Sequence, residues 1–177
     1  MESILSRLKG NAIILKSYSL VAFAIILFFG SCISKTEDPV ITKITAENYK
    51  NLTLNLKKKT IVHYWFSYCE PCIKEMPALE KMASENNLDV LHISADKSDS
   101  KMQDNLSTVL KKLEMKTCYI VDFDDLYPGG TKFIAIQRDF AKKVGWPSFG
   151  SPYYILLDKN GKTIIAADEL SKIKQKL

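Results

Sequence analysis

The sequence has few cysteines and histidines, the usual ligands of structural zinc, and no pattern typical of nucleic-acid binding. Its 177 residues include four cysteines and two histidines, and their spacing offers no second ligand pair of the kind that a structural zinc site needs. The formal net charge is +5, but no basic stripe interleaved with aromatic side chains occurs, so we expect no nucleic-acid partner. Repeats and low-complexity blocks are absent from the sequence. The balance of 46% hydrophobic and 25% charged residues is that of an ordinary globular domain.

A hydrophobic run long enough to cross a membrane comfortably is also missing. The apolar run SLVAFAIILFFG, residues 19–30, is shorter than the roughly 20 residues that a span requires. It follows a basic segment, and the two together predict an export signal over residues 1–32. The run ends in FFGSC, which resembles the lipobox of bacterial lipoproteins, with Phe29 where leucine is usual. The resemblance implies cleavage before Cys32 and a lipid on that cysteine; the alternative is an uncut signal anchor with Cys32 unmodified.

Both alternatives place the remaining chain on the outer side of the cytoplasmic membrane, in the periplasm or another extracytoplasmic space, and attach it to a membrane surface. Residues 33–39 are predicted to be a polar tether, and residues 40–177 the folded domain. No glutathione pool keeps thiols reduced outside the cytoplasm, so disulfides form and persist there. This location governs how the other cysteines are interpreted.

The pattern of apolar residues predicts alternating strands and helices followed by a hairpin. TIVHYWF, residues 60–66, has no polar alternation and is expected to be a central strand buried on both faces. A glycine turn at residues 159–161 predicts the hairpin. Strands are expected at 40–44, 60–66, 88–94, 117–122, 153–158 and 162–167, and helices at 46–56, 72–85, 100–115, 132–145 and 168–177. This order predicts an α/β fold with a mixed central sheet and helices on both faces.

The stretch YWFSYCEPCIKEMPAL holds two cysteines, Cys69 and Cys72, separated by two residues. A bridge between them closes too small a loop to act as a structural staple. A C-x-x-C pair between a strand and a helix suits thiol–disulfide exchange. Cys69 is expected at the helix N-terminus, where backbone N–H groups and the helix dipole stabilise a thiolate, and Pro71 suits the first helical turn. Cys69 would then attack a disulfide, and Cys72, one turn on, would resolve the mixed disulfide.

This stretch resembles the active-site region of thioredoxin-fold proteins, and more closely that of the TlpA/ResA-like membrane-tethered oxidoreductases. The matching residues are Trp65 and Phe66 before the cysteines, Pro71 between them, and Glu75 and Pro77 after them. The resemblance extends over residues 45–177. It implies a thioredoxin-like fold and a thiol–disulfide oxidoreductase. We expect neither a cofactor nor a metal.

A second matching motif lies far along the chain, in GSPYYILLDKNGKTI, residues 150–164. By this resemblance Pro152 is the cis proline beside the active site, preceded here by Ser151 where Thr, Val or Ile is frequent. His63 stands where the family commonly has Asp or Asn. The resemblance implies that His63 could carry a proton to or from Cys72; the alternative is a packed strand histidine satisfied by the backbone.

The sequence allows two interpretations for each of three further residues. Trp65 is either a platform under the cysteine pair or an ordinary core residue. Glu75 either tunes the cysteines or is an exposed helix acid. Cys118 is expected to be a buried, inert thiol in a strand, and the alternative is a partner cysteine.

The charge of Glu70 indicates the direction of electron flow. A carboxylate beside Cys69 disfavours the thiolate and should raise the pKa of that thiol. A less stabilised reduced form makes a weaker oxidant, so we predict a reductase. The family parallel implies disulfide-bearing exported proteins as substrates and a membrane thiol–disulfide relay as the electron donor.

Other functions on the same fold remain as alternatives. One is a disulfide oxidant or isomerase. Another is a copper chaperone, which the two-residue cysteine spacing and the strand position of His92 disfavour. The last is a scaffold with a vestigial cysteine pair.

Overall fold

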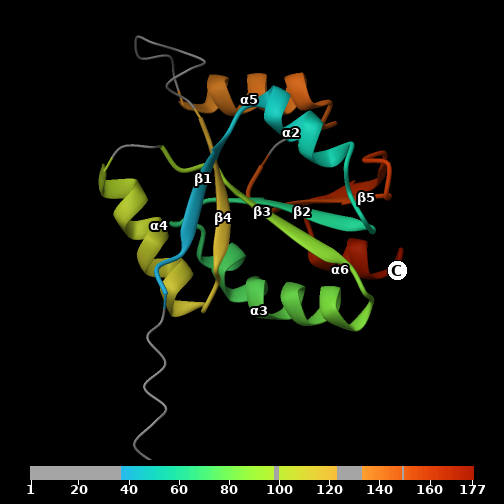
Figure 1. The fold of residues 1–177 in the computed structure, drawn as a ribbon, viewed down its shortest axis with the longest axis horizontal. Helices are drawn as coiled ribbons and strands as arrows, with labels where there is room; N and C mark the ends of the chain where they lie inside the picture. The colour runs from blue at the N-terminus through green and yellow to red at the C-terminus, as the bar shows by residue number, and fades with distance from the viewer. Residues whose placement is uncertain (1–36, 98–99, 123–132, 149) are drawn as a thin grey trace, which may run out of the picture. The chain divides into compact units, whose positions relative to one another are not determined.

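The computed structural model describes residues 37–97, 100–122, 133–148 and 150–177 (Figure 1). The predicted export signal at residues 1–32, with Cys32, lies outside these described residues. The strands are β1 (Val40–Ile44), β2 (Thr60–Trp65), β3 (Asp89–Ser94), β4 (Thr117–Val121), β5 (Tyr153–Leu157) and β6 (Thr163–Ala167). The helices are α2 (Ala46–Thr53), α3 (Glu70–Glu85), α4 (Ser100–Lys112), α5 (Phe133–Val144) and α6 (Leu170–Lys174).

The described strands form one sheet in the order β1-β4-β3-β2-β5-β6. The pairs β1/β4, β4/β3 and β3/β2 are parallel, while β2/β5 and β5/β6 are antiparallel. Every residue of β2 is buried, as its uninterrupted apolar character predicted. The predicted mixed sheet with β2 at its centre is therefore confirmed.

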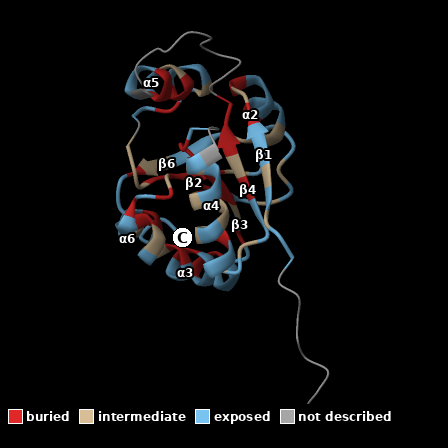
Figure 2. Ribbon diagram, turned by 90° about the vertical axis from the view of Figure 1, so that its left-hand side faces the viewer, coloured by how far each residue is buried: buried red, intermediate tan, exposed pale blue. Residues whose placement is uncertain are grey.

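Helices cover both faces of the sheet, with α2 and α5 on one side and α3, α4 and α6 on the other (Figures 1 and 2). Side chains alternate along β2 between these two layers. Val62 and Tyr64 belong to the same buried cluster as Phe140 of α5. Ile61 belongs to a cluster with α3 and α6, and Trp65 to one with α3 and α4. The strand is thus shared between two cores.

Two helices, α2 and α3, begin after a residue whose side chain caps them. Thr45 caps α2 as predicted, with its Oγ1 accepting the Asn48 backbone N–H at 3.1 Å. The helix ends at Thr53 rather than at residue 56, because Asn51 and Thr53 are weak helix formers. Helix α3 begins at Glu70, two residues earlier than predicted, because Cys69 caps it.

The last predicted helix, residues 168–177, is shorter than expected. It spans Leu170–Lys174, preceded by Glu169 without a side-chain cap. Asp168 was expected to begin this helix, but its carboxylate pairs with Lys172 Nζ at 2.7 Å. With no side-chain cap to extend it, the helix covers little more than one turn.

The predicted hairpin between β5 and β6 depends on one glycine. Gly161 has φ +76°, a conformation that glycine adopts without strain. A Cβ at this position would lie 2.5 Å from the Thr53 carbonyl oxygen. The turn therefore requires glycine both for its backbone conformation and for its packing against the end of α2.

The end of the predicted tether is attached to the domain. Asp38 pairs with Lys111 of α4, with 2.7 Å between carboxylate and ammonium. The Val40 N–H donates to the Lys116 carbonyl oxygen at 2.8 Å. In the part of the chain that the structure describes, no helix combines the length and hydropathy that a membrane crossing requires.

Candidate active site

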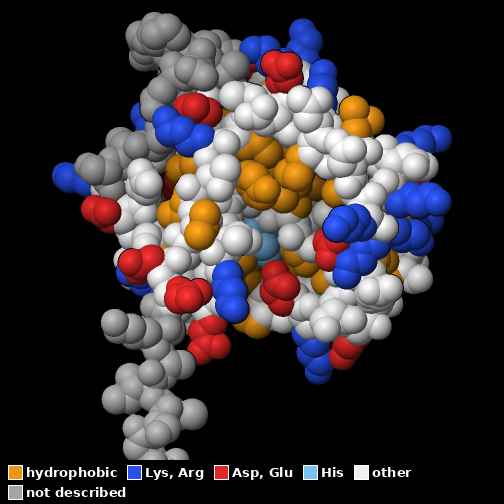
Figure 3. Space-filling view, viewed as in Figure 1, with side chains coloured by type: hydrophobic (Ala, Val, Ile, Leu, Met, Phe, Trp, Pro, Cys, Tyr) orange, Lys and Arg blue, Asp and Glu red, His pale blue; other side chains and the backbone are white. Residues whose placement is uncertain are grey.

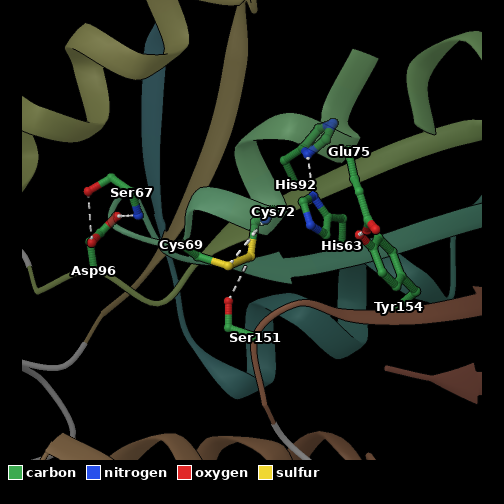
Figure 4. The surroundings of a disulfide bond; sticks show 9 residues. All are labelled: His63, Ser67, Cys69, Cys72, Glu75, His92, Asp96, Ser151 and Tyr154. Atoms are coloured by element: carbon green, nitrogen blue, oxygen red, sulfur yellow. Dashed lines mark hydrogen bonds between the residues drawn. A yellow bond between two sulfur atoms is a disulfide. The ribbon is translucent and has the colours of Figure 1, made fainter. Parts of the chain in front are cut away.

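The cysteine pair lies where β2 ends and α3 begins. Cys69 and Cys72 are joined by a disulfide, and Cys69 is the N-cap of α3 (Figure 4). The Cys69 Sγ accepts the Cys72 backbone N–H at 3.3 Å. Cys69 retains 6% of its surface, whereas Cys72 has none exposed. The placement of Cys69 at the helix N-terminus and of Cys72 further in agrees with the prediction.

Glu70, the carboxylate beside the cysteine pair, forms an ion pair with a lysine on the same helix. Glu70 is exposed, and its Oε1 lies 2.7 Å from Lys74 Nζ. This hydrogen bond and the lysine charge hold the pKa of Glu70 below its usual range. A Cys69 thiolate would thus meet the repulsion of Glu70 partly offset by Lys74.

The loop before β5 reaches the buried cysteine. The Ser151–Pro152 peptide bond is cis, as predicted for Pro152. The Ser151 Oγ lies 3.1 Å from the Cys72 Sγ. The sequence marked Ser151 only as an unusual residue before the cis proline and did not reveal this contact. A hydroxyl here can donate a hydrogen bond to the Cys72 sulfur when that sulfur is reduced and charged.

Strand register assembles a row of polar rings on the face of the sheet toward α3. His63 of β2 pairs in register with His92 of β3 and with Tyr154 of β5. The two histidine Nδ1 atoms lie 3.1 Å apart. The His63 ring also stacks on Tyr154, with centroids 4.9 Å apart, and on Trp65 at 6.2 Å. Burial, and secondarily the proximity of His92, places the pKa of His63 well below its ordinary value.

The helix α3 supplies a carboxylate to each end of this row. Glu75 Oε2 accepts from the Tyr154 hydroxyl at 2.5 Å, and Glu80 Oε1 lies 2.6 Å from His92 Nε2. Burial, together with the hydrogen bond to Glu75, raises the pKa of Tyr154. Glu75 is therefore half-buried and engaged by Tyr154, so it is not the exposed helix acid of the second interpretation.

The packed-histidine alternative predicted that the backbone would satisfy His63, but the structure shows another partner. Its Nδ1 pairs with a side chain, His92, rather than with the backbone. The sequence does hint at the contact between His63 and His92, because each histidine is the fourth residue of its strand. Only the parallel register shows that the two rings meet.

A second polar network holds the loop that leads to Cys69. The buried carboxylate of Asp96 accepts the Ser67 N–H at 2.9 Å, the Ser67 hydroxyl at 3.1 Å and the Ser94 hydroxyl at 2.7 Å. Asn105 of α4 donates to the Ser67 Oγ at 2.7 Å. Sequence reasoning missed these residues, although Ser67 and Asp96 follow the carboxyl ends of adjacent parallel strands, where sites often form.

Two other predicted residues lie in the core beside the pair. Trp65 is fully buried and belongs to the same hydrophobic cluster as Cys69 and Cys72. Cys118 is free and buried in β4, as predicted, and burial raises the pKa of its thiol to about 12. Across the described ranges, no three His, Cys, Asp or Glu side chains are arranged to hold a metal ion.

The cysteine pair lies in a segment that matches a known protein family. The model of the Redoxin family matches residues 35–174, which include both cysteines and the cis proline. The chain belongs to the Redoxin family. With its strand-to-helix C-x-x-C disulfide, this Redoxin-family protein is a thiol–disulfide oxidoreductase of thioredoxin-like fold. No curated protein matches the sequence.

Several solved structures are similar to this Redoxin-family chain. The thioredoxin domain of a thiol-disulfide oxidoreductase from Bacteroides vulgatus is 21% identical, with 71% of this chain and 81% of that chain covered and a TM-score of 0.46. StoA from Bacillus subtilis is 18% identical, with coverages of 68% and 83% and a TM-score of 0.46. The pneumococcal exposed lipoprotein thioredoxin from Streptococcus pneumoniae is 18% identical, with coverages of 72% and 90% and a TM-score of 0.46.

Proposed function

We propose that this protein is an extracytoplasmic reductase that acts on disulfides of exported proteins through Cys69 and Cys72. The observation that carries the proposal is the unequal placement of the two sulfurs. Cys69 caps the helix and keeps some exposure, and Cys72 lies fully buried behind it. Only the first can meet a bulky substrate disulfide, and only the second is placed to complete the reaction.

The reaction proceeds in two exchanges. The Cys69 thiolate attacks one sulfur of the substrate disulfide, and the other substrate sulfur leaves as a thiolate. Cys72 then loses its proton and attacks the Cys69 sulfur, which releases the second substrate thiolate and forms the Cys69–Cys72 disulfide. His63 is proposed to take the Cys72 proton, with Trp65 beneath the pair and Pro152 beside it.

The proposal that the protein acts as a reductase rests on the charge beside Cys69. Glu70 places a negative charge next to Cys69, and this disfavours the thiolate and so the reduced form. Lys74 offsets part of that repulsion without removing it. The dipeptide Glu70–Pro71 lacks a cation that would favour the thiolate. A pair of this kind is a better donor than oxidant.

The proposed location rests on the sequence before the domain. The export signal at residues 1–32 and a lipid on Cys32 would hold the protein at a membrane surface on the extracytoplasmic side. A Cys69–Cys72 disulfide formed there must be reduced again before another turnover. A membrane thiol–disulfide relay is the proposed electron donor, because glutathione does not maintain reduced thiols in that compartment.

An equilibrium titration of the Cys69–Cys72 pair in dithiothreitol buffers tests the direction. We expect a potential near that of thioredoxin, about −270 mV. A potential near about −120 mV, that of the strongest periplasmic oxidants, would reject the reductase and favour the oxidant alternative.

Metabolic labelling with a radioactive fatty acid tests the location separately. The wild-type chain should take up label and fractionate with membranes, and Cys32→Ser should lose the label. Label retained in that variant would place the lipid elsewhere or reject lipidation at Cys32.

A further inference from the structure

The carboxylate of Asp96 is buried and accepts hydrogen bonds at both of its oxygens. Its Oδ2 accepts the Ser67 N–H at 2.9 Å and the Ser94 hydroxyl at 2.7 Å, and its Oδ1 accepts the Ser67 hydroxyl at 3.1 Å. A carboxylate that accepts several hydrogen bonds is stabilised in its ionised form. Only 1% of Asp96 is exposed, so water and salt screen this negative charge far less than they screen a surface charge.

The hydrogen bonds of Asp96 fasten the turn that carries Cys69. Ser67 stands two residues beyond the end of β2, and the Cys69 N–H donates to the Phe66 carbonyl oxygen at 2.9 Å to close the turn. Asn105 of α4 donates to the Ser67 Oγ at 2.7 Å from the other side. Two residues span at most about 7 Å, so the Cys69 backbone stays close to the carboxylate that holds Ser67 (Figure 4).

The charge of Asp96 acts on the hydrophobic cluster that contains the cysteines. Cys118 shares this cluster with Cys69 and Cys72. Burial is the main cause that raises the pKa of the Cys118 thiol to about 12, and the charge of Asp96 adds to it. The same two causes raise the pKa of Tyr64. A negative charge that disfavours one thiolate in this cluster also disfavours a thiolate at Cys69.

Glu70, the carboxylate next to Cys69 in the chain, is in a different position from Asp96. It is exposed and lies 2.7 Å from the ammonium of Lys74. Salt and water screen such an exposed charge, whereas the effect of a buried charge persists at high ionic strength. Of the two carboxylates, Asp96 is therefore the one whose charge the solvent cannot cancel.

We propose that Asp96 is a positioning residue that keeps the reduction potential of the Cys69–Cys72 pair low, because it holds the turn before Cys69 against a buried negative charge. This inference rests on the proposed reductase function and deepens it. In equilibrium with dithiothreitol, the protein disulfide gains two electrons and two protons to become two thiols, and dithiothreitol loses them as it forms a cyclic disulfide. Where Cys69 ionises, the Asp96 charge opposes that ionisation and so favours the disulfide.

Asp96 is one of several titratable groups near Cys69, so its contribution has to be measured separately. Among the described residues, the charged and titratable groups around the pair are Tyr68 of the turn, Glu70 and Lys74 of α3, His63 of β2 behind Trp65, and Cys118 of β4. Variants that remove one negative charge at a time distinguish the two carboxylates.

Asp96→Asn removes the charge and keeps the shape of the side chain and one accepting oxygen. In the reduced full-length chain, the pH dependence of iodoacetamide alkylation at Cys69, located by mass spectrometry, gives the pKa of that thiol. We expect it to fall by about one unit, the effect of one charge at roughly 10 Å inside a protein. At a pH above both values, the equilibrium with dithiothreitol should shift about tenfold toward the reduced protein, which is about 30 mV.

Ser67→Ala is the matched control, because it removes a hydroxyl from the same contact and leaves the charge of Asp96 in place. A loosened turn would move the Cys69 sulfur away from the Cys72 N–H that it accepts, and this would raise the pKa of Cys69. A purely structural role of Asp96 thus predicts a shift in the opposite direction. Ser67→Ala should not lower the pKa of Cys69.

Salt distinguishes the two carboxylates. The shift caused by Asp96→Asn should persist at about 1 M salt, and that caused by Glu70→Gln should shrink there. A pKa of Cys69 that rises or stays unchanged in Asp96→Asn would overturn the inference alone. The reductase proposal fails separately if the wild-type potential matches that of strong periplasmic oxidants, whatever the variants show.

A measurement on the wild-type chain does not depend on how any variant folds. The ¹³C resonance of the Asp96 carboxyl group should show an ionised carboxylate at neutral pH in both the oxidised and the reduced protein. A protonated Asp96 in either state would also overturn the inference, because a neutral group has no charge with which to act on Cys69.

Discussion

Both faces of the sheet around β2 carry hydrophobic clusters, but only one of them also carries buried histidines. Toward α2 and α5, Tyr64, Tyr49, Phe140 and Trp146 form edge-to-face ring pairs with centroids 5.1 to 6.3 Å apart. One hydrogen bond, from Trp146 Nε1 to the Tyr49 hydroxyl at 3.1 Å, links two of these rings. Toward α3, the next residue of the same strand, His63, begins a polar row. Alternation along one strand thus separates an aromatic core from a reactive face.

The difference teaches which face contributes stability and which contributes chemistry. Buried aromatic rings in edge-to-face pairs add stability beyond the area that they bury. Buried titratable groups are costly unless fully paired, so a row such as Glu80–His92–His63 is a poor way to stabilise a core.

Figure 3 shows that charges of both signs surround hydrophobic side chains gathered in the middle of the face in view, so no single-sign patch dominates there.

Removing a reacting sulfur should have the largest effect on activity. Cys69→Ser should reduce insulin reduction by roughly a thousandfold or more, because the nucleophile is gone. Its melting temperature should stay close to that of the reduced wild type. Cys118→Ser is the control, since Cys118 is a free, buried thiol outside the pair, and activity should persist there. Reduction that survives in Cys69→Ser would mean that another group carries the reaction.

A cavity in the aromatic core should affect stability instead. Phe140→Ala should lower the free energy of unfolding by about 3–5 kcal/mol in urea titrations, through lost burial and the cavity left behind. Where the variant stays folded, its rate of thiol exchange should match the wild type. Ile134→Ala on the same helix is the control, because Ile134 is 61% exposed, and it should cost less than about 0.5 kcal/mol. Equal losses from the two variants would contradict the assignment of this core.

The pH dependence of stability tests the buried histidine. Burial lowers the pKa of His63 in the folded state, so below pH about 6.5 the unfolded chain binds a proton that the folded chain refuses. Stability should therefore fall as pH falls from about 6.5, by at most about 1.4 kcal/mol per pH unit from this residue. His63→Phe should have a shallower slope in urea titrations between pH 7 and 5.5. Parallel slopes would show that His63 titrates normally in the folded protein.

The smallest expected effect is that of the hydroxyl beside Cys72. Ser151→Ala removes a donor 3.1 Å from the Cys72 sulfur, and the reduced form loses about 1 kcal/mol of stabilisation. The reduction potential should become more negative by about 20 mV. Ser148→Ala, at an exposed position three residues earlier, should leave it unchanged. A potential that rises in Ser151→Ala would reverse the proposed sense of the hydrogen bond.

Much of the fold followed from local signals. The unbroken apolar run of β2, the capping Thr45 and the turn at Gly161 each specify their element through nearby residues. The short α6 did not follow, because an acid near a helix start can cap it or pair with a lysine one turn on. Asp168 does the latter, and sequence alone does not decide between the two.

The site was predictable where one segment carries it. Cys69, Cys72 and Pro71 lie in a single stretch, and their positions at the start of α3 agree with the prediction. The contacts of His63 with His92 and Tyr154 depend on the register of three strands. Register is a tertiary property, so the sequence marked His63 as unusual without revealing its partners.

Trapping a mixed disulfide tests the central claim most directly. In Cys72→Ala the second exchange cannot occur, so the substrate should remain bonded to Cys69 as an adduct that dithiothreitol releases. Mass spectrometry of the adduct should place the bond at Cys69, and Cys69→Ala should form none. No adduct in Cys72→Ala, or an adduct on Cys118 instead, would contradict the assignment of Cys69 as the attacking sulfur.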